Sequence, residues 1–387
     1  MGIARKTAIV GVGSTPYYKR GRSAPQTLPE LVGKAVIAAV ADTGLAMKDV
    51  DGITSYSGGF DTPYLMETLG IPEVRFTSIL TGSGGGSAGA VGLASAAIVA
   101  GLADVVVVVG GVQQGVQRFG SVTQSYDSLP ENAFYESAGL IGPGHMFALL
   151  ARRHMHRYGT TREHFAEVAI STRLNAIGHP DAIIRKPLTR DDYFAAPMIS
   201  DPLCLFDFCL ESDGAIAVVV TSTERARDLR QKPVVVHGST QGGESGWGRS
   251  LYWMNMPEDQ FLTSGHRSVA RDLWRQSGLT PADIDTAQIY DHFTPQVIAQ
   301  LEDYGFCGPG EGGPFVASGA IRYEGGSLPV NTDGGQLSGG YIWGMSHIRE
   351  AVAQIRGNAV NQVKDAKLAL VTGGPSSIPM SGLILGE

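Results

Sequence analysis

The chain has 387 residues, of which 43% are apolar and 17% are charged, and its formal net charge is −7. This length and composition predict a globular protein with a large buried fraction, built from two similar domains or from one large layered unit. The negative charge argues against nucleic acid as a partner, because a phosphate backbone requires a basic surface.

Apolar runs and helical periodicity predict strands and helices in alternation along the chain. The predicted strands cover residues 7–12, 50–57, 105–110, 215–220 and 234–238. The predicted helices cover residues 28–41, 88–100, 147–158 and 223–230. Residues 111–213 form a long segment of mixed character. The alternation predicts an α/β fold with mostly parallel strands.

The apolar stretch 88–109 is the one segment whose composition approaches that of a membrane span. Gly101 and Asp104 divide it into a helix rich in small residues and a β-branched strand. The N-terminus lacks a secretory apolar region followed by a cleavage site. The three cysteines show no metal-ligand spacing, and their odd number gives no disulfide framework. These features predict a soluble, cytoplasmic protein without a membrane or metal partner.

An internal repeat relates the two halves of the chain. Residues 44–51, G-L-A-M-K-D-V-D, match residues 278–285, G-L-T-P-A-D-I-D, at an offset of 234. Each block follows an amphipathic helix and leads into a strand. Both halves also end in an apolar strand that closes on Gly-Gly, over residues 105–111 and 367–374. These matches predict a duplicated α/β unit.

Residues 331–346, N-T-D-G-G-Q-L-S-G-G-Y-I-W-G-M-S, are too rich in glycine for a regular helix or strand. Such a run is typical of a loop whose backbone approaches a ligand closely. Tyr341 lies within it. A helix with His347 on its surface is predicted just afterwards from the spacing of Met345, Ile348 and Val352. A tyrosine on a glycine-rich turn is a candidate acid or base, although in isolation such a tyrosine is more often a packing residue.

Residues 84–111, G-G-G-S-A-G-A-V-G-L-A-S-A-A-I-V-A-G-L-A-D-V-V-V-V-V-G-G, resemble the thiolase superfamily. In thiolases this segment carries the nucleophilic Cys at a helix N-terminus, then a small-residue helix and a Val-rich strand. The resemblance covers nearly the whole chain. It implies an α/β fold of the duplicated, five-layer αβαβα type, with halves at 1–230 and 231–387 and a loop domain inserted at about 111–213. It also implies a homodimer and an acyl-CoA substrate.

The chain departs from the thiolases at the residues that carry their chemistry. The nucleophilic Cys corresponds to Gly84, and the second Cys corresponds to Val371. The histidine of the family's G-H-P motif becomes Tyr341, and the Asn or His that opens the N-E-A-F or H-D-C-F motif becomes Tyr290. Thiolysis and Claisen condensation need a thiolate to hold the acyl group. The sequence therefore indicates that this chain is not a thiolase.

Tyrosine at both positions resembles the thiolase-like aldolases of bacterial steroid side-chain degradation, which are related to the lipid-transfer-protein thiolases. The resemblance implies a carbon–carbon lyase that cleaves a 17-hydroxy steroid β-hydroxyacyl-CoA into a ketosteroid and a short acyl-CoA such as propionyl-CoA. One tyrosine takes the hydroxyl proton and the other protonates the enolate, with no covalent intermediate and no cofactor. Phenols with a pKa of about 10 can do this if the site lowers one pKa or binds the alkoxide strongly.

The resemblance also implies roles for residues around the two tyrosines. By family position, the backbone N–H groups of Gly84 and Gly373 stabilise the thioester enolate. The missing side chain at Gly84 leaves room for a tertiary alcohol on a large ring system, or it merely allows tight helix packing. Asp291 and His292 flank Tyr290 and are candidates for tuning its proton, whereas a hydrogen bond at a helix start is the alternative role of Asp291.

The related aldolases work with a small partner that carries an OB-fold and a zinc ribbon. This implies a heterotetramer of two copies of the present chain and two partner chains. Two other functions remain open from the sequence. An aldolase acting on another sterol or a bile-acid side chain would use the same residues, whereas a non-catalytic subunit that binds acyl-CoA or sterol would not require the paired Tyr290 and Tyr341.

Overall fold

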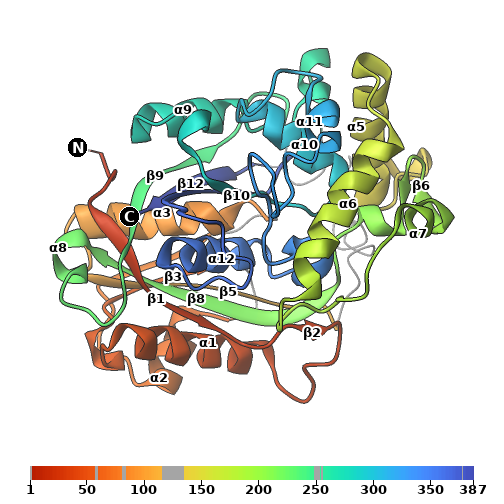
Figure 1. Ribbon diagram of the computed structural model, residues 1–387. Helices are drawn as coiled ribbons and strands as arrows, with labels where there is room; N and C mark the ends of the chain where they lie inside the picture. Colours follow the sequence, from red (N-terminus) through yellow and green to blue (C-terminus); the bar gives the residue numbers. More distant parts are fainter. Residues whose placement is uncertain are drawn as a thin grey trace.

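The computed structural model describes residues 2–56, 60–80, 84–115, 135–247, 253, 256–376 and 378–387. In this part of the chain, a large mixed sheet has the strand order β10-β11-β12-β9-β1-β8-β5-β3-β4 (Figure 1). Its strands are β1 (Thr7–Ser14), β3 (Gly52–Tyr56), β4 (Phe76–Leu80), β5 (Val105–Gln113), β8 (Ser212–Ser222), β9 (Val234–Gly242), β10 (Thr286–Gln288), β11 (Leu368–Gly373) and β12 (Met380–Gly386). The short strand β2 (Tyr18–Lys19) pairs with β8, and β6 (Met198–Ser200) pairs with β7 (Leu203–Cys204).

The two halves of the large sheet repeat one topology. From the junction of β1 with β9, one half continues as β8, β5, β3 and β4, and the other continues as β12, β11 and β10, to which Val330 adds a parallel bridge. Pairs near the junction are antiparallel, and those toward the two edges are parallel. The predicted duplication is confirmed. The predicted predominance of parallel strands is wrong, because an apolar run identifies a buried strand without fixing its direction.

Helices form three layers that alternate with the two halves of the sheet, as Figure 1 shows. Helices α1 (Leu28–Thr43) and α2 (Thr62–Leu69) lie on the outer side of the N-terminal half, and α9 (Arg267–Ser277), α10 (Thr294–Asp303) and α11 (Gly312–Ala317) lie on the outer side of the C-terminal half. Helices α3 (Gly86–Val99) and α12 (Met345–Arg356) lie between the halves, inside an apolar cluster drawn from both. The predicted αβαβα layering is therefore confirmed.

Equivalent aspartates start equivalent strands in the two halves. Asp51 accepts hydrogen bonds from the backbone N–H groups of Asp104 and Val105, at the start of β5. Asp285, at the repeat offset, accepts from Lys367 (2.8 Å) and Leu368 (2.9 Å), at the start of β11. The short motif that predicted the duplication is therefore a structural device that joins neighbouring strands.

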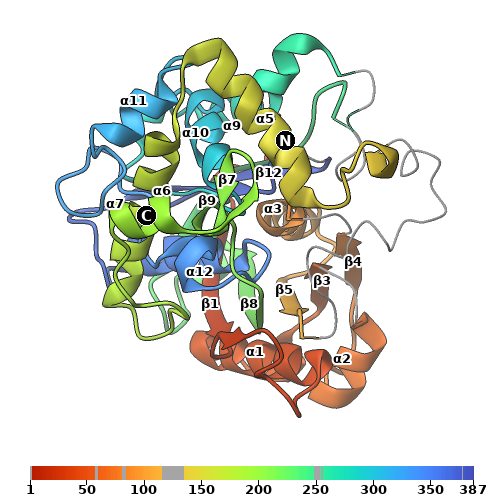
Figure 2. The same ribbon diagram turned by 90° about the vertical axis from the view of Figure 1, so that its right-hand side faces the viewer.

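The segment between β5 and β8 packs on the opposite half of the molecule. It includes the helices α5 (Pro143–Tyr158), α6 (Arg162–Ile177) and α7 (Arg190–Ala195). Helix α6 contacts α10 and α11 and also residues 335–339, all of which belong to the C-terminal half (Figures 1 and 2). The insertion therefore packs against residues 335–339, which lie just before Tyr341 in the chain. The domain limits 1–230 and 231–387 stay a prediction.

Two local predictions need correction. The helix predicted over 223–230 ends early, as α8 (Thr223–Ala226), because the following N–H groups bond three residues back in turns. The glycine-rich run contains a short π-helix, Gly335–Gly339, although a loop was predicted. Asp291 stabilises this turn by accepting from the N–H groups of Gln336 and Leu337. In the described part of the chain, no helix combines the length and apolarity needed to cross a membrane.

Asp285→Asn tests the strand-starting role of the repeated aspartate. The substitution keeps the shape of the side chain and removes its charge from two backbone N–H bonds. We expect the free energy of unfolding to fall by about 1.5–3 kcal/mol, measured by urea denaturation. Asp272→Asn is the control, because Asp272 makes surface ion pairs with Arg271 and Arg275 and should change stability by less than about 1 kcal/mol. Equal effects of the two substitutions would contradict this role.

Candidate active site

Tyr290 and Tyr341 meet in the interior of the protein. The Tyr290 hydroxyl donates a hydrogen bond to the Tyr341 hydroxyl over 3.1 Å, and the two rings stand at 81° with centroids 6.4 Å apart. Their side chains are 1% and 3% exposed. The structure therefore brings together the two phenols that the sequence singled out from segments far apart in the chain.

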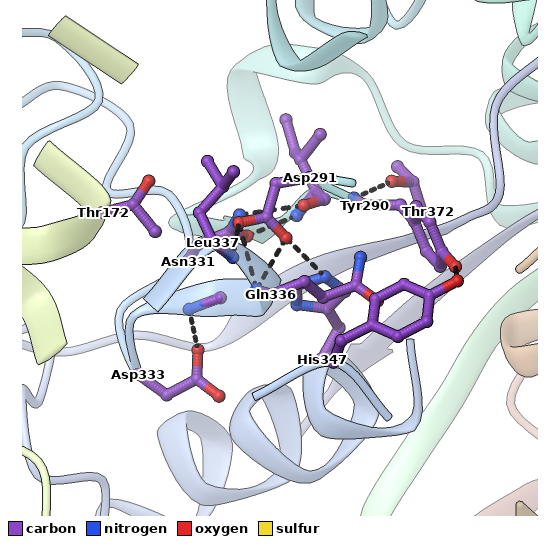
Figure 3. A network of polar contacts seen from close by, with 12 residues as sticks. Thr172, Tyr290, Asp291, Asn331, Asp333, Gln336, Leu337, His347 and Thr372 are labelled. Atoms are coloured by element: carbon purple, nitrogen blue, oxygen red, sulfur yellow. Dashed lines mark hydrogen bonds and ion pairs between the residues drawn. The ribbon is translucent and has the colours of Figure 1, made fainter. Parts of the chain in front are cut away.

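Backbone contacts fix the position of each tyrosine. The Tyr290 N–H donates to Thr372 Oγ1 at the end of β11 (2.8 Å), as Figure 3 shows. The Tyr290 carbonyl accepts from Gln300 Nε2 on α10 (2.8 Å), and Gln300 in turn accepts from the Thr372 hydroxyl. The Tyr341 N–H donates to Ser212 Oγ at the start of β8 (3.0 Å). Strand and helix ends from both halves of the sheet thus hold the pair.

Burial raises the pKa of both phenols well above the usual value near 10. The hydrogen bond acts in opposite directions on the two partners, because it raises the pKa of the donor, Tyr290, and lowers that of the acceptor, Tyr341. Both side chains are therefore neutral at neutral pH. The mechanism inferred from the sequence requires either a lowered phenol pKa or strong binding of the alkoxide. A lowered phenol pKa does not hold in this structure.

Gly84 lies directly against the Tyr290 hydroxyl. Its backbone is left-handed, with φ of +42°, and a Cβ there would stand 2.3 Å from the Tyr290 oxygen. The Tyr290 hydroxyl therefore occupies the space that a Cβ would fill, and the expectation that the missing side chain makes room for a bulky alcohol stays a prediction. A side chain at position 84 and the tyrosine pair exclude each other sterically.

The glycines assigned to enolate stabilisation lie in two segments that touch. A Cβ at Gly374 would stand 2.2 Å from the Gly85 nitrogen, and a Cβ at Gly373 would stand 3.1 Å from the Gly85 carbonyl oxygen. The start of α3 and the end of β11 therefore meet beside Tyr290. The role of the Gly84 and Gly373 N–H groups as donors to an enolate stays a prediction.

Asp291 contacts the π-helix and His347, and among the described residues its carboxylate makes no hydrogen bond to a phenol. Its carboxylate accepts from the N–H groups of Gln336 and Leu337, and its Oδ1 lies 3.2 Å from His347 Nε2 (Figure 3). These contacts support the alternative role of Asp291, a hydrogen bond at a helix start. The expectation of a surface-exposed His347 is wrong, because α12 lies between the sheet halves and the His347 side chain is 0% exposed.

His292 packs against Tyr290 as a neutral imidazole. Its ring centroid lies 5.2 Å from that of Tyr290 and 4.4 Å from that of Phe147. Burial lowers the pKa of His292 to about 3, so the ring carries no proton charge at neutral pH. Its Nδ1 is buried without a hydrogen-bond partner in the described residues. A tuning role for His292 stays a prediction, and it would be that of a neutral donor or acceptor.

Two residues near the tyrosine pair were not predicted from the sequence to lie there. Tyr56, at the end of β3, is fully buried, and Cys209 is bonded through its backbone N–H to the His292 carbonyl. A charge on either residue would raise the pKa of Tyr290. The sequence did contain a signal for Tyr56, because it stands 234 residues before Tyr290, at the repeat offset. Cys209 has no comparable signal.

Comparison with known proteins identifies a family model and relatives that are similar to this chain. The family model "Thiolase C-terminal domain-like" matches residues 249–384. The chain is 42% identical to 17-hydroxy-3-oxo-4-pregnene-20-carboxyl-CoA lyase of Mycobacterium tuberculosis, over 99% of this chain and 100% of the relative. It is 41% identical to the steroid side-chain-cleaving aldolase of Thermomonospora curvata, over 98% and 97%.

Solved structures agree with these relatives. The Ltp2-ChsH2(DUF35) aldolase superposes with a TM-score of 0.92 at 38% identity, covering 100% of this chain and 99% of that chain. Human mitochondrial 3-ketoacyl-CoA thiolase in complex with CoA superposes with a TM-score of 0.72 at 17% identity, over 100% and 99%. The second likeness concerns the fold alone.

Glu350 makes a pH-dependent contact with the loop that carries Tyr341. It lies on α12, accepts from the Thr332 hydroxyl (2.6 Å) and from Gln354 Nε2 (3.0 Å), and is buried. Burial, followed by the nearby charge of Asp333, raises the pKa of Glu350 from 4.5 to about 8. At neutral pH this carboxyl group is therefore protonated in the folded protein.

Glu350→Gln tests this support. Between pH 4.5 and 8 the folded protein keeps the Glu350 proton while the unfolded chain releases it. The group therefore lowers the free energy of unfolding by about 1.4 kcal/mol for each pH unit in that window. The glutamine variant lacks this loss, so its stability relative to the unmodified protein should increase from pH 5 to pH 8. Urea denaturation at several pH values measures the difference, and a pH-independent difference would contradict the assignment.

Proposed function

We propose that this chain, which belongs to the thiolase-like steroid side-chain-cleaving aldolases, cleaves a 17-hydroxy steroid β-hydroxyacyl-CoA by a retro-aldol reaction. The products are a 17-ketosteroid and a short acyl-CoA such as propionyl-CoA. The observation that carries the proposal is the buried pair of phenols in hydroxyl contact, at a position where Gly84 leaves no thiol. A thiolase cannot work with this set of residues, because it needs a cysteine thiolate to hold the acyl group.

The substrate follows from the relatives and from the chemistry of the pair. The Mycobacterium tuberculosis relative is named as a lyase of a 17-hydroxy steroid carboxyl-CoA. Breaking the bond between the hydroxyl-bearing carbon and the carbon next to the thioester needs one proton removed from oxygen and one added to carbon. Two adjacent phenols supply both operations, so the thioester is the substrate and no cofactor takes part.

The hydrogen bond gives the proton transfer a direction. The substrate hydroxyl gives its proton to the Tyr290 oxygen, Tyr290 gives its own proton to Tyr341, and Tyr341 protonates the carbon next to the thioester. The electrons of the broken C–C bond pass onto the thioester oxygen as an enolate and return to carbon with that proton. The hydroxyl oxygen becomes the ketone oxygen. Because both phenols are neutral, neither has to exist as a free phenolate.

Tyr290→Phe and Tyr341→Phe test the catalytic assignment. Each substitution removes one hydroxyl and keeps the ring, so packing is largely retained. We expect each to lower kcat by about 10²–10⁴-fold while acyl-CoA binding persists. The double variant should lose less than the product of the single losses, because both groups act in one step. Release of ketosteroid from the steroid thioester, followed by mass spectrometry, is the measurement.

Tyr193→Phe is the matched control for these variants. Tyr193 is also a buried tyrosine, but its hydroxyl donates to Asp207 (2.7 Å), in the inserted segment. This variant should lose stability and keep kcat. Near-normal turnover of Tyr290→Phe or Tyr341→Phe would show that the tyrosine only packs. Thioester binding without any ketone release by the unmodified protein would favour a non-catalytic binding subunit, and cleavage of only bile-acid or other sterol thioesters would change the substrate.

The proposed assembly is a homodimer joined through β4. This strand ends the order of the large sheet, and among the described residues it pairs with β3 alone. On it, Ile79 is 54% exposed. An unpaired edge with an exposed apolar side chain favours pairing with a second copy. The solved relative named Ltp2-ChsH2(DUF35) includes a second component, which supports a heterotetramer with two copies of a small OB-fold and zinc-ribbon protein.

Ile79→Lys tests the dimer. A charged side chain on each of two adjoining edges repels the other copy, so we expect a monomer by sedimentation equilibrium. Ile37→Lys is the control, since Ile37 is 52% exposed but lies on the outer helix α1, and it should leave the assembly unchanged. A dimer that survives Ile79→Lys at micromolar concentration would rule out pairing through this edge.

A further inference from the structure

Ser87 carries a buried hydroxyl that no contact among the described residues explains. It lies in the first turn of α3, three residues after Gly84, and is 0% exposed. Its Oγ has no hydrogen-bond partner among the described residues. A hydroxyl removed from water without a partner costs free energy, and such groups in native proteins are commonly explained by function.

The Ser87 hydroxyl is one of the groups that line the candidate active site. A Cβ at Gly344 would stand 2.7 Å from Ser87 Oγ and 3.0 Å from the Tyr290 ring. A Cβ at Gly373 would stand 3.1 Å from the same hydroxyl. Ser87 Oγ therefore lies where the start of α3, the turn before α12 and the end of β11 converge beside Tyr290.

Two helix N-termini make this place favourable for negative charge. Helices α3, with 14 residues, and α12, with 12, both begin here, and neither has an acidic residue in its first turn. Ser346, in the first turn of α12, is a second buried hydroxyl without a described partner. Helix N-termini stabilise anions through their free N–H groups and their dipoles. The anion that a retro-aldol cleavage creates is the enolate oxygen of the departing thioester.

We propose that Ser87 is a further catalytic residue, whose Oγ–H donates a hydrogen bond to the thioester oxygen as that oxygen becomes an enolate. This inference rests on the proposed function and adds a side-chain donor to the backbone donors assigned to Gly84 and Gly373. The hydroxyl is unpaired without substrate because its partner is the charge that develops during the reaction. Donors pre-positioned in this way lower the barrier rather than increase substrate affinity.

Ser87→Ala and Ser95→Ala form a matched pair on one helix. Both serines are buried on α3, but the Ser95 hydroxyl is bonded to Thr7 Oγ1 (2.8 Å). Ser87→Ala should lower kcat by about 10²–10³-fold with little change in KM, and its Tm should be unchanged or higher. Ser95→Ala should lower Tm and keep kcat. A structural role for Ser87 predicts the opposite: a lower Tm with kcat retained.

A second measurement separates this inference from the proposed function. Propionyl-CoA labelled with carbon-13 at the thioester carbonyl is bound to each variant, and the carbonyl infrared band is recorded. The unmodified protein and Ser95→Ala should shift the band to lower frequency, and Ser87→Ala should reverse much of the shift. If the shift depends on Ser87 but no steroid thioester is cleaved, the donor stands and the proposed function is wrong. If cleavage occurs and Ser87→Ala changes neither kcat nor the band, the inference is wrong.

Discussion

A hydrogen bond between two phenols shielded from water is the constraint on which the site depends. It joins Tyr290 and Tyr341 over 3.1 Å, and it requires a backbone without a side chain at position 84, since a Cβ there would meet the Tyr290 oxygen. In water such a pair would contribute little. In the interior both phenols stay protonated, because burial raises both pKa values. In the proposed mechanism, proton transfer along the pair replaces the covalent chemistry that a cysteine would perform.

The duplicated fold supplies the framework for this pair. The two halves bring the N-termini of α3 and α12 to one place, and both helices lie between sheet halves that bury them. The same duplication places Tyr56 and Tyr290 at equivalent positions, 234 residues apart, and Tyr56 is close enough to influence the pKa of Tyr290. The inserted segment closes over the C-terminal half through α6. The site is therefore formed by both halves and the insertion together.

Much of the fold could be predicted from the sequence, because buried strands are apolar runs and the repeat is visible at Asp51 and Asp285. Strand direction could not, since side-chain patterns are the same in parallel and antiparallel neighbours. Tyr290 and Tyr341 were found through motifs. Their raised pKa values were not, because burial depends on segments distant in sequence. His347 was misplaced for a related reason: helical spacing predicts one buried face, whereas nine of the twelve residues of α12 are buried. The glycine at position 84 indicated that a side chain had been lost. It did not indicate that the Tyr290 hydroxyl fills the space of that side chain.

The central claim is that two neutral phenols move protons together while the C–C bond breaks. The measurement that tests it most directly is the single-turnover rate of steroid thioester cleavage in mixtures of H₂O and D₂O. If the hydroxyl, Tyr290 and Tyr341 protons move in one step, the rate should fall along a curve that bows below a straight line as the deuterium fraction rises. A rate that does not change with deuterium, combined with a rate that rises with pH as a phenol ionises, would contradict the account.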